Sequence, residues 1–181
     1  MLDISVAYNR YRFLGNEFLT WLWFLIENDQ AALPTQDAEP VALTVGNRMV
    51  LENRLANGLE TITIKGDAAG LEEALLALSK GAWVTDINLV FKSGSLEWQF
   101  SLKGESLGIS GLKLPETAAL ETDEDVAGLV MEKLYLYEKP MAFIDGLYDA
   151  FIRQRLSDTW SNQTVPLMRR WMQAQNASAE A

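Results

Sequence analysis

The chain contains no cysteine and no histidine among its 181 residues. The absence of cysteine excludes a disulfide framework and any chemistry that needs a thiolate. The absence of histidine removes the commonest general base, the base of a catalytic triad and the usual zinc ligand. Glycine-rich phosphate loops and nucleophile elbows are also missing from the sequence. An enzyme built on this chain would have to use carboxylate, lysine, tyrosine or serine side chains, and no grouping of these stands out.

Positive charge is scarce: 15 lysine and arginine residues face 25 acidic residues, which gives a formal net charge of −10. This balance argues against a wholly basic nucleic-acid surface, although it allows a local basic patch. The early Asp3 and the lack of a basic leader argue against a signal peptide. We therefore expect a cytoplasmic protein without a membrane partner.

The longest apolar run is Phe18–Ile26, which is apolar on every side of a helix. It is too short to cross a bilayer, which needs about 20 residues, and it lacks the basic face of an interfacial helix. The run predicts a buried core helix that begins near Gly15 or Asn16, with Asn16 as its N-cap, and ends near Asn28.

Turn dipeptides and two-residue alternation predict an antiparallel sheet after this helix. Gly46-Asn47 is predicted to be a turn between two strands. On the later strand Leu96–Lys103, apolar and polar residues alternate, which indicates one buried face. The predicted strands cover 41–45, 48–55, 59–65, 83–92, 96–103 and 107–114, and a helix is predicted at 68–80, capped by Asp67.

A long helix is predicted over Asp125–Leu156, with Thr122 near its start and a kink at Pro140. A short helix at 166–173 follows. The predicted fold class is α+β, with an antiparallel sheet of five or six strands packed against an apolar N-terminal helix and the long kinked C-terminal helix. We expect one domain over residues 1–174 and a disordered tail over 175–181.

Three carboxylates share one face of the long helix: Glu138, Asp145 and Asp149. Carboxylates at such spacing can hold Mg²⁺ in a nuclease or phosphotransfer site. Metal sites usually draw ligands from several elements, so a solvated helix face is the favoured interpretation. We therefore predict no enzyme, no metal and no cofactor, and keep a carboxylate-metal nuclease as the lesser alternative.

Basic residues gather mainly towards the C-terminus, at Arg153, Arg155, Arg169 and Arg170, and the smaller pair Arg10 and Arg12 is interpreted as ordinary surface charge. Such a group can contact phosphates of DNA without reading base sequence. Cations near a helix C-terminus are also favoured by the helix dipole alone. The pattern fits both interpretations equally well.

Two blocks of the chain resemble the divergent RdgC-like recombination-associated proteins. The segment Arg12-Phe13-Leu14-Gly15-Asn16-Glu17-Phe18-Leu19-Thr20-Trp21-Leu22-Trp23-Phe24 is similar to the one that opens the C-terminal half of those proteins. Met131–Lys139, Phe143–Tyr148, Arg153–Leu156, Trp160 and Arg170-Trp171 look like their closing region. Most of this chain is covered by the resemblance, which extends over only the later half of the full-length family members.

The resemblance implies a non-enzymatic, sequence-nonspecific association with double-stranded DNA, linked to recombination, and a homo-oligomer. The family's N-terminal region has no counterpart here. The alternative is therefore a protein-interaction or scaffold module that pairs with a separate partner protein and does not itself bind DNA.

Overall fold

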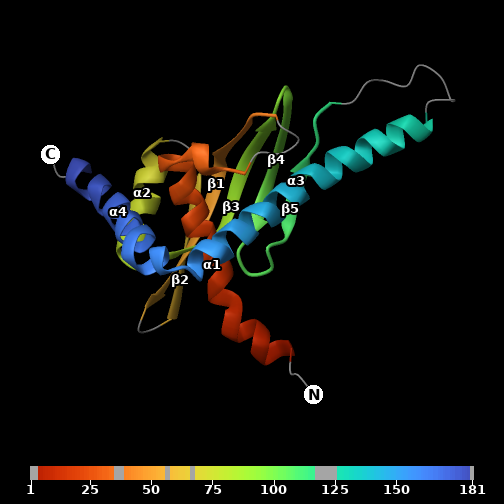
Figure 1. Cartoon of the computed structure of the whole chain (residues 1–181). Coiled ribbons are helices and arrows are strands. Elements are labelled where there is room, and N and C mark those ends of the chain that lie inside the picture. Colours follow the sequence, from red (N-terminus) through yellow and green to blue (C-terminus); the bar gives the residue numbers. More distant parts are fainter. Residues whose placement is uncertain (1–3, 35–38, 56–57, 66–67, 117–125, 180–181) are drawn as a thin grey trace.

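The computed structural model describes residues 4–34, 39–55, 58–65, 68–116 and 126–179 (Figure 1). The chain folds into helices packed on an antiparallel sheet, so the predicted α+β class is confirmed. The elements are α1 (Ile4–Asn28), η1 (Gln30–Ala32), β1 (Val41–Leu55), β2 (Gly58–Lys65), α2 (Ala68–Ser79), β3 (Trp83–Ser93), β4 (Leu96–Lys103), β5 (Ile109–Lys113), α3 (Val126–Arg155), η3 (Trp160–Thr164) and α4 (Val165–Ala179).

The sheet has five strands in the order β2-β1-β3-β4-β5, and each neighbouring pair is antiparallel. Trp98, Phe100 and Leu102 of β4 are buried on one face, as the alternation in the sequence predicts. Helices α1 and α3 cross this buried face (Figure 1). The ring of Phe143 on α3 stacks on Phe91 of β3 with their centroids 4.3 Å apart.

The apolar run is the centre of the core, as predicted: Phe18, Leu19, Leu22 and Trp23 have no exposed surface. The predicted start of this helix was wrong, because α1 already begins at Ile4. Its first half projects away from the sheet (Figure 1). Asn16 therefore lies inside the helix rather than at its cap.

The predicted turn at Gly46-Asn47 was also wrong, since β1 runs through it as one long strand. The pairing of β1 with β3 shifts register between Val45 and Met49, which marks a bulge. The Oδ1 atom of Asn88 accepts a hydrogen bond from the backbone N–H of Asn47 at 3.3 Å. A Cβ atom on Gly46 would lie 2.1 Å from that same oxygen, so a side chain at this position would displace the carboxamide of Asn88.

Helix α3 is continuous through Pro140, and its bounds match the predicted helix to within one residue at each end. The kink itself stays a prediction. Helix α4 continues to Ala179, into the segment for which the sequence predicts a disordered tail. The predicted caps Asp67 and Thr122 lie outside the described residues. None of the described helices is long and apolar enough to cross a membrane.

Candidate functional site

The four predicted phosphate-contacting arginines lie at the end of α3 and on α4, and they differ in their surroundings. Arg153, Arg169 and Arg170 are exposed, and none of them forms an ion pair with another described residue. Arg155 is half-buried, and its Nε donates to Oε2 of Glu17 at 2.8 Å. Its guanidinium also lies over the ring of Trp160, 5.5 Å from the centroid. Arg155 is thus already occupied, whereas the other three are available to a ligand.

One arginine of this group, Arg169, lines a pocket between the C-terminal end of α2, the start of β3 and α4. Its volume is about 400 Å³, and Arg169, Glu17, Trp83 and Trp160 are among its lining residues. Trp83 is 42% exposed, which is unusual for an indole in a strand. We call this site the α2–α4 pocket. It combines a free cation with an exposed aromatic surface, a pairing that suits a phosphate linked to a flat ring.

Arg170 lies on the other flank of α4, in a larger groove of about 750 Å³. We call it the α1–α4 groove. Its walls come from α1, α3, η3 and α4, and Asp29 and Arg170 are its charged members. The remaining lining residues are Trp21, Phe24, Leu25, Asn28, Ala32, Leu147, Ala150, Gln154, Thr164, Leu167 and Trp171. The structure therefore places Arg169 and Arg170 in two different sites, and neither Arg153 nor Arg155 lines either of them.

The segment between α3 and α4 positions both sites. Residues Trp160–Thr164 form a π-helix, a form that is rare and frequently found at functional sites. It buries Trp160 edge-on against Phe151, with their centroids 5.6 Å apart. Trp160 and Thr164, which are both buried, then each line one of the two sites.

The carboxylates of the lesser alternative do not form a site. Glu138, Asp145 and Asp149 are all exposed on α3. Within the described residues, no group of three or more acidic side chains could hold a metal ion. The three carboxylates are therefore exposed to solvent on one helix.

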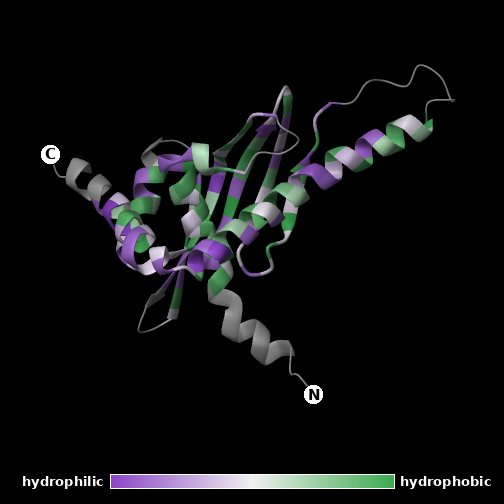
Figure 2. Ribbon diagram, in the orientation of Figure 1, coloured by the Kyte–Doolittle hydropathy of each residue, from purple (hydrophilic) through white to green (hydrophobic). Residues whose placement is uncertain are grey.

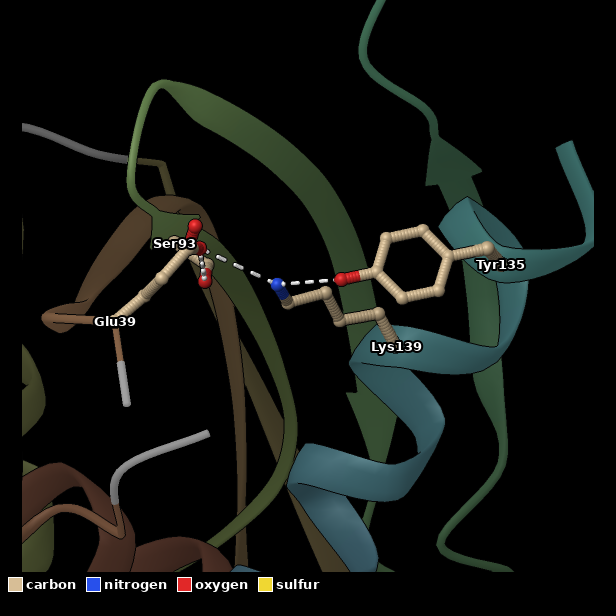
Figure 3. Close-up of polar contacts among 4 residues, drawn as sticks. All are labelled: Glu39, Ser93, Tyr135 and Lys139. Carbon is tan, nitrogen blue, oxygen red and sulfur yellow. Dashed lines mark hydrogen bonds and ion pairs between the residues drawn. The ribbon is translucent and has the colours of Figure 1, made fainter. Parts of the chain in front are cut away.

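A buried lysine, which sequence reasoning missed, lies on the same helix. The side chain of Lys139 is only 2% exposed, and its Nζ donates to the hydroxyl of Tyr135 at 2.9 Å (Figure 3). The same atom lies 3.5 Å from Oε2 of Glu39, which also accepts a hydrogen bond from Ser93. These contacts connect Glu39, which precedes β1, to α3.

The first half of α3 is the other prominent surface feature. It extends beyond the sheet as a free-standing helix with hydrophobic residues along it (Figures 1 and 2). We call residues 126–137 the α3 arm. Its large apolar side chains are 46–64% exposed: Val126, Val130, Met131, Leu134, Tyr135 and Tyr137. An exposed apolar cluster of this kind usually marks an interaction site.

Comparisons with known proteins found no matching family model, no matching curated protein and no matching solved structure. The RdgC-like resemblance therefore stays a prediction that rests on the two sequence blocks alone.

Proposed function

We propose that this chain is a non-enzymatic, RdgC-like protein of the cytoplasm that associates with DNA through its phosphates, without reading base sequence. The α2–α4 pocket carries the proposal, because Arg169 and the exposed Trp83 both line it. Exposed Arg153 and Arg170 add two cations that no described carboxylate neutralises. Arg155 contributes less, because Glu17 already pairs with it.

The charges make this binding weak and strongly dependent on salt. Each phosphate that a protein neutralises adds about −0.9 to the slope of log K against log[salt]. Three free arginines therefore predict a slope of about −3, which is roughly a 40-fold loss of affinity between 50 and 200 mM salt. The net charge of −10 opposes any contact outside this end of the molecule.

The test is fluorescence anisotropy with duplex and single-stranded DNA of two unrelated sequences across a salt series. Replacing Arg153, Arg169 and Arg170 together by alanine should abolish binding and remove the salt slope. A matched control replaces three exposed lysines elsewhere, Lys65, Lys92 and Lys103, and should change binding far less. Equal losses in the two triple variants, or unchanged binding by the arginine variant, would refute the proposal.

The α3 arm favours a second candidate function, a protein-docking module. A helix that presents apolar residues to solvent at four-residue spacing matches the mode in which a helix binds in a groove of its partner. The test places a photo-crosslinking amino acid at Leu134, with the half-exposed Leu59 of β2 as the matched control position. Light-dependent adducts from position 134 alone would support docking, and the absence of adducts from the whole arm would contradict it.

A further inference from the structure

Two apolar surfaces without a cover lie at opposite ends of this molecule. The α3 arm projects at one end, and α4, which forms one wall of the α1–α4 groove, lies at the other (Figure 1). The arm therefore does not reach the groove of its own chain. We propose that the α3 arm of one copy binds in the α1–α4 groove of a second copy, an inference that rests on the docking function proposed for the arm.

Four of the six exposed apolar side chains of the arm form one stripe, whereas Met131 and Tyr135 lie further around the helix. At about 100° per residue, Val126, Val130, Leu134 and Tyr137 fall within one quarter of the helix circumference. The stripe is about 17 Å long at 1.5 Å per residue. Further along α3 the same face carries Ile144, which is buried, and Tyr148, whose ring meets Phe18 edge-on at 5.2 Å. The stripe is thus covered by this chain in one half of α3 and uncovered in the other.

The groove has the size and the lining that such a stripe requires. Its volume of about 750 Å³ accommodates several large side chains, and the aromatic rings of Trp21, Phe24 and Trp171 line it. Leu167 in its wall is 49% exposed. Aromatic residues in a concave apolar site commonly provide most of the binding energy at protein interfaces.

The charges beside the two surfaces are complementary. Lys133 of the arm and Glu138, the residue that follows the arm, lie on opposite edges of the stripe at 100° per residue. At the groove, Asp29 follows the end of α1, whereas Arg170 lies on α4. In the proposed complex Glu138 of one copy pairs with Arg170 of the other, and Lys133 pairs with Asp29. Rim charges of this kind fix orientation more than they add affinity.

The resulting contact joins two different surfaces, so each copy keeps one free arm and one free groove. Such a head-to-tail contact closes into a ring or continues as a filament. The average mass should therefore rise with protein concentration. It stops at a dimer if each of two copies places its arm in the groove of the other, and it continues beyond a dimer if larger rings or filaments form.

The test is sedimentation velocity over a concentration series with the full chain and two variants. Leu134→Glu disables the arm and Leu167→Glu disables the groove, and each should weaken association about tenfold or more. Both leucines are about half exposed, so the fold should tolerate the changes. An equimolar mixture of the two variants should form a 1:1 dimer and nothing larger, since it offers one intact arm–groove pair. Leu59→Glu on β2 is the control and should associate like the unmodified chain.

Three results would overturn the inference, and each can be distinguished from a failure of the proposed docking function. Persistent association of Leu167→Glu would show that arms pair with arms instead. Failure of the mixture to form the dimer would exclude the arm–groove contact. A strictly monomeric chain would exclude self-association, while adducts from position 134 with another protein would still support docking.

A charge exchange tests the orientation of the arm in the groove. Glu138→Arg and Arg170→Glu should each weaken association about two- to fivefold, and the two substitutions combined should restore it.

Discussion

Trp98 supplies the hydrogen bond that Pro140 cannot. The indole Nε1 of Trp98 donates to the carbonyl oxygen of Leu136 at 2.8 Å. That carbonyl lies four residues before Pro140, so in an uninterrupted helix the N–H of residue 140 would be its partner. Trp98 is fully buried and Leu136 is 3% exposed, so water could not easily replace the donor. A side chain of the sheet therefore completes the backbone hydrogen bonding of α3.

This relationship predicts coupling between residues 98 and 140. Trp98→Phe should lower the free energy of unfolding by about 2–4 kcal/mol, because it leaves the Leu136 carbonyl without a donor and reduces packed volume. Pro140→Ala restores a backbone N–H and should recover about 1 kcal/mol in the Trp98→Phe background, with less effect in the unmodified chain. Urea unfolding of the four proteins measures the coupling. Trp83→Phe, at a partly exposed indole, is the control, and equal effects of Pro140→Ala in both backgrounds would contradict the relationship.

The sequence predicted those parts of the fold that burial controls. Phe18–Ile26 had to be covered on every side, and the two-residue period of β4 required one buried face. The extension of α1 to Ile4 and the bulge at Gly46 escaped prediction for two different reasons. The first half of α1 projects from the core, and the bulge depends on Asn88, which lies about forty residues further along the chain.

The candidate site was less predictable, because it depends on tertiary contacts. The arginines could be found by their type, but the pairing of Arg155 with Glu17 joins residues 138 positions apart. Trp83 is the first residue of a predicted strand, and nothing in its local sequence pattern indicates that its side chain is exposed. The α3 arm has apolar spacing that resembles core patterning, so the sequence could not separate a buried stripe from an uncovered one.

Gly15 and Gly104 approach so closely that neither tolerates a side chain. A Cβ atom on Gly15 would lie 1.7 Å from the carbonyl oxygen of Gly104. Gly15→Ala should therefore force α1 away from the turn after β4 and destabilise the protein by about 3 kcal/mol. Gly146→Ala is the matched control on α3, where nothing lies within 4 Å, and should stabilise by about 0.5–1 kcal/mol. Thermal and urea unfolding would show the opposite signs, and a neutral Gly15→Ala would mean that the helix position adjusts freely.

The ion pairs Lys139–Glu39 and Lys92–Glu97 test whether burial or distance decides how much an ion pair contributes to stability. Lys92 and Glu97 approach within 2.8 Å with both side chains 56% exposed, whereas Lys139 is buried 3.5 Å from Glu39. Glu39→Gln should lower the free energy of unfolding by about 1–2 kcal/mol. Glu97→Gln should lower it by less than about 0.5 kcal/mol, although Lys92 and Glu97 are closer together. A larger effect at Glu97 in urea unfolding would reverse this ranking.

Replacing the buried cation itself should have little effect on stability. Lys139→Met removes the charge together with its desolvation cost and keeps the packed length of the side chain. We expect the free energy of unfolding to change by less than about 1 kcal/mol. A loss above about 3 kcal/mol would show that the lysine contributes a net stabilising interaction that its burial does not offset.

Gln154 joins three elements at the floor of the α1–α4 groove. Its Oε1 accepts from the indole N–H of Trp21 at 3.0 Å, and its Nε2 donates to Oγ1 of Thr164 at 2.9 Å. Gln154→Met should cost about 2–3 kcal/mol, since the indole of Trp21 and the hydroxyl of Thr164 both lose their partner. Gln154→Glu should cost less than about 1 kcal/mol, because the hydroxyl of Thr164 can rotate and donate to the carboxylate. Gln163→Met, at an exposed site on the same π-helix, is the control for urea unfolding. If glutamate and methionine at position 154 proved equally costly, the hydrogen bonds would not be what holds α1, α3 and η3 together.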